Sequence, residues 1–133
     1  MAMQYSVAVR NAKLDAVEAA IGTSPILRIY SGSIPANTAA ARTGTVLATA
    51  TLPSDWMNAA SSGSKTKLGT WQDTSADATG TAGYFTIFDS TGTTAHIQGT
   101  VGLSAADMIL DSVSFTAGQS FTVTTFTINS GNA

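Results

Sequence analysis

From residue 25 to the end of the chain, segments rich in β-branched and aromatic residues recur roughly every ten residues, with polar turns between them. This spacing is typical of all-β domains built from short strands. We expect strands over residues 25–30, 45–52, 65–71, 84–88, 94–102, 107–115 and 119–129. The sequence therefore predicts a mainly β fold, an antiparallel β-sandwich or jelly-roll-like barrel with one N-terminal α-helix.

Helical periodicity is clearest before residue 22. Apolar residues at spacings of three, four and seven predict one stripe made of Val7, Leu14, Val17 and Ile21. Ser6 or Asn11 can cap the start of this helix, and Gly22 suits its end. We therefore divide the chain into an N-terminal arm and helix, residues 1–22, and a single β-domain, residues 23–133. The helix either packs on its own domain or is reserved for a partner, and the sequence leaves both open.

Two further segments have local signatures. In the last expected strand the apolar positions move from Phe121 and Val123 to Phe126 and Ile128. Because side chains alternate across a strand, this change of parity predicts a β-bulge. Residues 53–60 begin with a proline, which the first turn of a helix tolerates, so we expect one or two helical turns there.

Charge is scarce in this chain. Only 11% of its residues are charged, against roughly 25% in a typical soluble domain, and six Lys and Arg oppose eight Asp and Glu. So few cations predict no nucleic-acid partner, and no apolar stretch is long enough for a membrane span. The first residues do not resemble a signal peptide. Because strand edges usually carry Lys or Pro, we expect these edges to be covered by loops, by the N-terminal helix or by other subunits.

Residues for catalysis or metal binding are few, since the chain has one His, one Glu and no Cys. His96 lies in an expected strand and is assigned a structural role. The segment Asp73–Gly80 resembles the first half of a calcium loop, but Ala78 and Tyr84 stand where that motif requires Gly and Glu. We favour an Asx-rich turn there and keep weak calcium binding at Asp73 and Asp77 as the alternative. A carboxylate pair from Asp73, Asp77 and Asp89 stays open as well, because spacing does not show which of them meet. We predict no enzyme, no cofactor and no metal.

Large aromatic residues give a different alternative. Trp56, Trp71 and Tyr84 would stack on sugar rings if exposed on a β-sandwich. The competing interpretation places both tryptophans in the core or in an interface, where so large an apolar surface usually lies.

Several segments, taken in order, resemble a known family. They are Arg10–Pro25 followed by Ile26-Leu-Arg-Ile-Tyr-Ser-Gly, then Pro35-Ala-Asn, Leu52-Pro-Ser-Asp-Trp-Met57, Gly69-Thr-Trp-Gln-Asp73, Gly80-Thr-Ala-Gly-Tyr-Phe85 and His96-Ile-Gln-Gly-Thr-Val101. This order is similar to that of a family of small virion proteins of tailed phages and prophages. The resemblance covers nearly the whole chain and includes no catalytic motif.

The resemblance implies a capsid decoration, or cement, protein. Such a protein would be made in the host cytoplasm, bind the major capsid protein at the capsid surface of the virion and form a homo-oligomer, a dimer or trimer. Candidate partner-interface residues are Tyr5, Val7, Arg10, Leu14, Trp56, Met57 and Trp71. The alternative is a carbohydrate- or receptor-binding β-module of a phage tail or fibre.

Overall fold

A computed structural model of the chain describes residues 3–133. Within them, one helix, α1 (Val7–Ile21), precedes ten strands. The strands are β1 (Ile26–Tyr30), β2 (Val46–Thr51), β3 (Ser64–Thr66), β4 (Gln72–Asp73), β5 (Gly80–Thr81), β6 (Tyr84–Phe88), β7 (Ala95–Gly102), β8 (Met108–Leu110), β9 (Ser114–Phe115) and β10 (Phe121–Asn129). The expectation of a mainly β chain with one N-terminal helix is confirmed.

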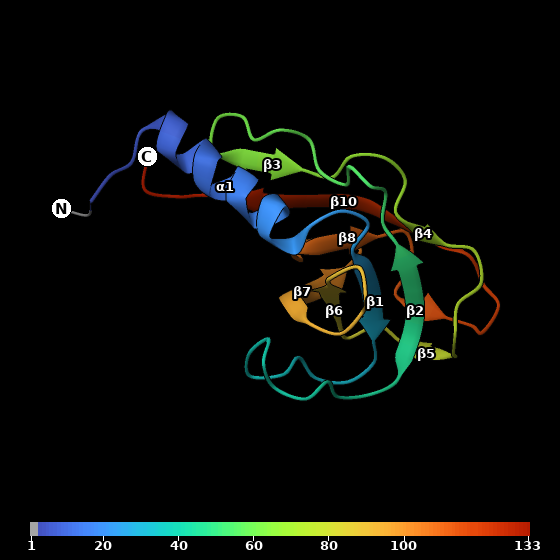
Figure 1. The fold of residues 1–133 in the computed structure, drawn as a ribbon. Helices are drawn as coiled ribbons and strands as arrows, with labels where there is room; N and C mark the ends of the chain where they lie inside the picture. Colours follow the sequence, from blue (N-terminus) through green and yellow to red (C-terminus); the bar gives the residue numbers. More distant parts are fainter. Residues whose placement is uncertain (1–2) are drawn as a thin grey trace.

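Most of the strands form a single curled sheet, a half-barrel (Figure 1). Its order is β2-β1-β6-β7-β8-β10-β3, with β4 beside β10, while β5 and β9 form a separate pair. The expectation of purely antiparallel pairing is wrong at one place, because β7 and β8 run parallel. The five-residue return between them is closed by Asp107 and Thr100, whose side chains each accept a hydrogen bond from the other's backbone N–H (3.1 and 2.9 Å).

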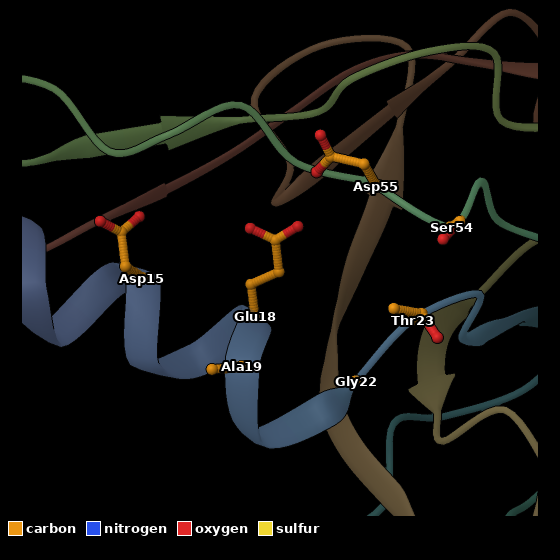
Figure 2. Close-up of a pocket in the computed structure, with 7 residues that line it drawn as sticks. All are labelled: Asp15, Glu18, Ala19, Gly22, Thr23, Ser54 and Asp55. Atoms are coloured by element: carbon orange, nitrogen blue, oxygen red, sulfur yellow. The ribbon is translucent and has the colours of Figure 1, made fainter.

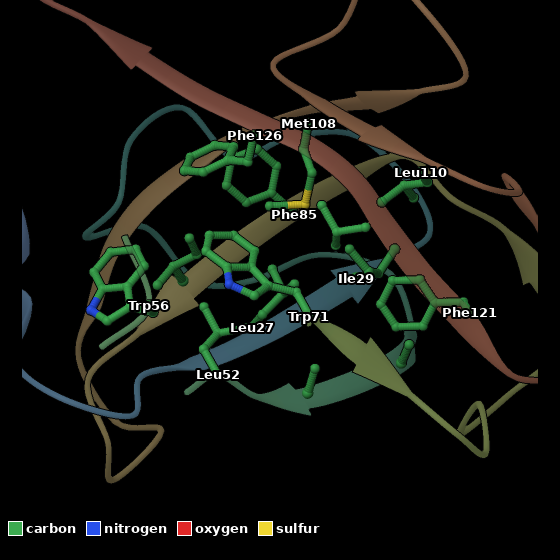
Figure 3. Packing of buried hydrophobic residues seen from close by; sticks show 14 of the residues in the cluster. Leu27, Ile29, Leu52, Trp56, Trp71, Phe85, Met108, Leu110, Phe121 and Phe126 are labelled. Carbon is green, nitrogen blue, oxygen red and sulfur yellow. The ribbon is translucent and has the colours of Figure 1, made fainter. Parts of the chain in front are cut away.

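The concave side of the sheet holds a chain of aromatic rings (Figure 3). Ring centroids are 5.9 Å apart for Trp56 and Trp71, 5.5 Å for Trp71 and Phe126, and 5.5 Å for Phe126 and Phe85. Both indole N–H groups have partners, since Trp56 donates to the carbonyl of Gly22 (2.9 Å) and Trp71 to that of Leu68 (3.1 Å). Buried tryptophans satisfied in this way are core residues.

A second, smaller cluster lies on the other face of the sheet, where the rings of Tyr30 and Tyr84 stack at 4.9 Å. The long connection between β1 and β2, residues 31–45, is tied down beside this cluster. Arg42 of this connection donates to Thr86 Oγ1 (3.0 Å) and Gln98 Oε1 (2.8 Å). β6 is therefore buried on both faces, which explains why its sequence is apolar almost throughout.

The edges of the sheet are covered by other parts of the chain. At β2, the backbone N–H of Thr49 donates to the Asp73 carboxylate (2.9 Å), and the N–H of Asp77 donates to the carbonyl of Leu47 (2.7 Å). At β3, bridges to Met57 and Ser61 occupy the outer edge. α1 packs over the same strand (Figure 1). This confirms the expectation that loops and the N-terminal helix protect edges that carry little charge.

The sequence signals at the two ends of α1 and inside β10 are confirmed. Ser6 caps α1 by accepting from the N–H of Val9 (3.3 Å), and Gly22 ends it at a φ of 91°. The register of β10 shifts between Val123 and Thr125, which confirms the predicted bulge.

Four expectations about local structure were wrong. Residues 53–60 form no helical turn, because Met57 bridges Lys67 and the N–H of Asn58 donates to the Thr66 carbonyl (2.8 Å). The strand expected over residues 65–71 is only Ser64–Thr66, and that over 107–115 is divided into β8 and β9. Val7 does not belong to the buried stripe of α1, since it is exposed.

Replacing Trp71 by Ala tests whether the aromatic chain holds the core together. The substitution leaves a cavity next to Trp56 and Phe126, and we expect the free energy of unfolding to fall by about 3–5 kcal/mol. Urea denaturation followed by circular dichroism measures this loss. Thr70→Ala, at the exposed neighbouring position, serves as the control and should change stability by less than about 0.5 kcal/mol. Equal effects of the two substitutions would contradict the assignment.

Candidate partner-binding surface on helix α1

One side of α1 is fixed to the body of the molecule. Leu14 and Ile21 are buried beneath it. The Arg10 guanidinium donates to the carbonyl of Ser130 (2.8 Å), and Asn11 accepts from the N–H of Gly63 (2.9 Å). These contacts join the helix to the end of β10 and to the turn before β3, two segments far from it in sequence. The helix is therefore held in one orientation.

A further attachment is an ion triad around the buried ammonium of Lys65. The side chain of Lys65, in β3, is only 1% exposed, and its Nζ lies 2.7 Å from Asp15 Oδ1 and 2.9 Å from Glu18 Oε1. Burial alone would lower the pKa of Lys65, but hydrogen bonds to Asp15 and Glu18 outweigh burial and raise it. The Lys65 hydrogen bond, followed by the N–H of Ala60, lowers the pKa of Asp15. Lys65 and Asp15 are therefore charged at neutral pH, and the triad links the helix to the sheet.

The other side of α1 is exposed and nearly uncharged. On this side Val9 is 43% exposed, while Val7, in the first turn and in line with Leu14 and Ile21, is 51% exposed. The exposed alanines of the helix are Ala8, Ala12, Ala16, Ala19 and Ala20. Lys13 supplies a positive charge on this side, and its Nζ lies 4.4 Å from the ring centroid of Tyr5. We call Val9, Ala12, Lys13 and Ala16 the outer face of α1, because 3.6 residues per turn place these four on the side of the helix opposite Leu14 and Ile21. Apart from Lys13, the side chains of this face are small, and contacts of Arg10, Asn11 and Lys65 hold the helix in place.

An open cleft lies beside α1, between the helix and the segment that carries Ser54 and Asp55 (Figure 2). It has a volume of about 450 Å³, and the carboxylates of Asp15, Glu18 and Asp55 line it. Two of these three carboxylates are already paired with Lys65. Within residues 3–133, no group of three or more His, Cys, Asp or Glu side chains is arranged to hold a metal ion.

The structure divides the predicted interface residues into two groups. Tyr5 and Arg10 are partly buried at the ends of the contacts described above, Leu14 is buried beneath the helix, and Val7 is exposed in the first turn of α1. The interface prediction is wrong for three residues, because they are buried in the core: Trp56, Met57 and Trp71. A partner that docks on this conformation does not reach them.

The residues behind the other sequence alternatives are accounted for by internal contacts. Tyr84 is buried, and its hydroxyl donates to the carbonyl of Thr43 (2.8 Å), so neither it nor the tryptophans form an exposed platform for sugars. Asp73 closes an Asx turn by accepting from the N–H of Ser75 (2.9 Å). That observation agrees with the favoured interpretation of the segment Asp73–Gly80.

The carboxylates considered as a pair fall in two places. Asp73 and Asp77 meet at Thr49, where Asp73 accepts from its N–H (2.9 Å) and Asp77 from its hydroxyl (2.8 Å). Asp89 lies in the β6–β7 turn and accepts from the hydroxyl of Thr91 (2.8 Å). That bond, followed by the N–H of Thr93, lowers the pKa of Asp89. His96, the neighbouring basic group, is exposed on β7.

Internal contacts also account for almost all the charge in the chain. Every cationic side chain contacts a carbonyl, a carboxylate or an aromatic ring: Arg10, Lys13, Arg28, Arg42, Lys65 and Lys67. The acidic residues, except Asp55 in the part of the chain that the structure describes, accept hydrogen bonds or pair with Lys65: Asp15, Glu18, Asp73, Asp77, Asp89, Asp107 and Asp111. Most charged side chains therefore have their partners within the same chain.

Sequence reasoning missed the Lys65 triad. Lys65 stands between Ser64 and Thr66, with no apolar pattern around it, so nothing local marks it as buried. The one available signal was the cluster of acidic residues at Asp15 and Glu18 on a single helix.

No helix among the described residues is long and apolar enough to cross a membrane. Comparison with protein-family models, with curated proteins and with solved structures gives no match.

The triad predicts that removing its carboxylates and removing its ammonium lower the free energy of unfolding by different amounts. Asp15→Asn with Glu18→Gln leaves a buried ammonium without an anion, whereas Lys65→Met leaves two carboxylates that solvent reaches. Because an unpaired buried charge costs the most, the loss of unfolding free energy should be roughly twice as large for the first variant. Chemical denaturation at pH 7 measures both losses, with Lys67→Met as the control. A larger loss for Lys65→Met would contradict the account.

The lowered pKa of Asp15 predicts a dependence on pH. A carboxylate with a lowered pKa stabilises the fold above its unfolded pKa, near 3.8, and this contribution is lost as the pH falls through the lower folded value. The stability difference between the wild type and Asp15→Asn should therefore be constant from pH 7 to about 4 and shrink below it. Thermal denaturation across this range measures it. In a Lys65→Met background the difference should be small at every pH, and a difference that persists unchanged at pH 2.5 would refute the coupling.

Proposed function

We propose that this chain is a structural virion protein that binds and stabilises the capsid shell of a tailed phage, without catalysis of its own. The observation that carries the proposal is the outer face of α1, where Val9 is half-exposed beside small alanine side chains on a helix fixed from behind by Lys65. The order of sequence segments that resembles small phage virion proteins gives the proposal its biological setting.

The composition of this face suits contact with another protein. Burying a charged group costs free energy unless a partner compensates it, whereas alanine and valine lose no hydrogen bonds when water is removed. Most charges of this chain already have partners inside the fold. Docking on the outer face therefore removes water from apolar atoms and from few charged groups.

Rigidity adds to this advantage. A flexible segment loses conformational entropy when a partner orders it, and a surface that is ordered beforehand avoids that cost. The contacts of Arg10, Asn11 and Lys65 order α1 in the free chain. The helix would thus meet the major capsid protein in the conformation that it already has.

Binding of this kind stabilises a shell by mass action. A protein that binds the assembled shell but not its separated subunits lowers the free energy of the shell at every occupied site, and the effect is multiplied over a repeated lattice. A homo-oligomer, a dimer or trimer, would bridge adjacent capsid subunits at the capsid surface. The protein would therefore stabilise the shell through binding alone, without catalysing a reaction.

Capsids that lack this chain provide the test. Purified protein should co-sediment with them and raise the temperature at which they release DNA. Val9→Asp places a charge on the outer face and should weaken binding at least about tenfold. An acidic residue in the first turn of a helix is favourable, so this variant should fold normally.

Thr124→Asp, at an exposed position of β10, is the matched control and should bind like the wild type. Failure of the wild type to co-sediment would refute the proposed function. Wild-type binding that Val9→Asp leaves unchanged would refute the assignment of the outer face.

A further inference from the structure

The wall of the half-barrel has a gap between β7 and β10. At one end β8 lies between these two strands, where it pairs with β7 at Val101 and Gly102 and with β10 at Phe126. β8 begins at Met108, and both of its neighbours extend beyond that residue. Adjacent strands lie about 4.8 Å apart, so β8 holds β7 and β10 roughly 10 Å from each other, the width of one further strand. An open cavity of about 410 Å³ occupies this gap, which we call the β7–β10 slot.

Main-chain groups of β10 face this slot. The Phe126 carbonyl and the Ser130 N–H both form hydrogen bonds on the β3 side of the strand (3.0 and 2.9 Å). Because main-chain groups alternate between the two sides of a strand, the N–H and carbonyl groups of Thr127 and Asn129 point away from β3. They point into the slot, where β8 no longer runs beside them.

The same alternation applies to β7, on the opposite wall. The N–H of Thr100 donates to the Asp107 carboxylate (2.9 Å), so it points away from β6. Gln98 stands two residues earlier, and its N–H and carbonyl therefore point in the same direction. The register of β7 with β6 is regular over this stretch, since its one shift lies beyond it, between Ile87 and Phe88. Main-chain donors and acceptors thus face the slot from both walls.

Neither wall carries the residues that usually prevent a strand from adding to an open edge. Such edges are commonly protected by Lys or by Pro. Residues 95–100 of β7 and residues 127–129 of β10 contain neither of them. The charged residue that lines the slot is Asp107, and its carboxylate is already bound to Thr100 at the end where β8 begins. The walls are therefore open to main-chain pairing.

These conditions define the occupant of the slot. An extended polypeptide segment offers N–H and carbonyl groups on both of its sides, at the two-residue repeat that Gln98, Thr127 and Asn129 require. To enter between two walls, the segment must have no strand neighbour of its own. The ten strands in the described part of this chain are already paired with one another, so a strand of a second copy would first have to leave its sheet. An unpaired segment of a different protein enters without that loss.

We propose that an extended segment of the major capsid protein enters the β7–β10 slot and adds a strand between β7 and β10. This inference rests on the proposed function, which makes the capsid protein the partner of this chain. The end of β10 that lines the slot is joined to α1, because Arg10 donates to the carbonyl of Ser130, the residue after Asn129 (2.8 Å). The slot and the helix are therefore neighbouring parts of the surface. Main-chain hydrogen bonds with Gln98, Thr127 and Asn129 supply the recognition.

The first test removes one main-chain donor from the slot. Thr127→Pro deletes the N–H that faces the slot, and the pairing of Ile128 with Lys65 of β3 remains. Thr127→Ala keeps this N–H and is the matched control. In co-sedimentation with capsids that lack this chain, Thr127→Pro should bind at least about tenfold more weakly than the wild type, because an acceptor of the capsid segment loses its donor. Thr127→Ala should bind like the wild type, and circular dichroism should show the same fold in all three.

The proposed function and the strand addition fail in different ways. A wild type that does not co-sediment would refute both. Equal binding by the wild type and the two variants would overturn the strand addition and leave the proposed function in place. Equal loss of binding in the two variants would also overturn it, because the side chain of Thr127 and not its main chain would then be recognised.

The second test uses the wild type alone and so does not depend on the folding of a variant. Hydrogen exchange, resolved to single amides by mass spectrometry with fragmentation, is compared between the free and the capsid-bound protein. The amides of Gln98, Thr127 and Asn129 should exchange at least about tenfold more slowly on the capsid. The amide of Ser130, bonded to the carbonyl of Gly63, is the control and should be protected in both states.

Two results of the exchange measurement would overturn the proposal. One is unchanged exchange of the three slot amides in protein that is bound to capsids. The other is protection of these amides in the free protein that grows with its concentration, because a second copy of the chain would then occupy the slot.

Discussion

The buried ammonium of Lys65 fixes the position of helix α1. That position determines which side chains of the helix are exposed. Lys65 lies in a three-residue strand, and its charge is stable in the interior only because Asp15 and Glu18 of the helix reach it. The pairing holds α1 against β3. It also decides which side of α1 meets water, the side that carries Val9, Ala12 and Ala16.

The low charge content acquires a structural meaning from this arrangement. Arg42 holds the β1–β2 connection onto the sheet, Asp73 closes the edge of β2, and Asp107 closes the return between β7 and β8. Each of these charges satisfies backbone or side-chain groups that would otherwise lack a partner. The side chains that remain for the surface are mostly threonine, alanine and serine. A second copy of the chain, or a capsid shell, that contacts this surface therefore removes water from few charged groups.

Local chemistry made part of this fold predictable. The caps at Ser6 and Gly22, the strong strand at β6 and the bulge in β10 follow from short-range rules, and all were confirmed. The parallel contact of β7 with β8 and the burial of Lys65 depend on partners distant in sequence, which a single chain does not reveal. For the same reason the interface prediction included Trp56 and Trp71, whose size fits a core and an interface equally well.

The proposed function makes the outer face of α1 the surface that contacts the capsid. The most direct measurement is a cryo-electron microscopy reconstruction of capsids decorated with this chain. The account predicts that the outer face of α1, with Val9 near its centre, lies against the major capsid protein. A reconstruction in which α1 faces solvent and the capsid contacts another side of the half-barrel would contradict it.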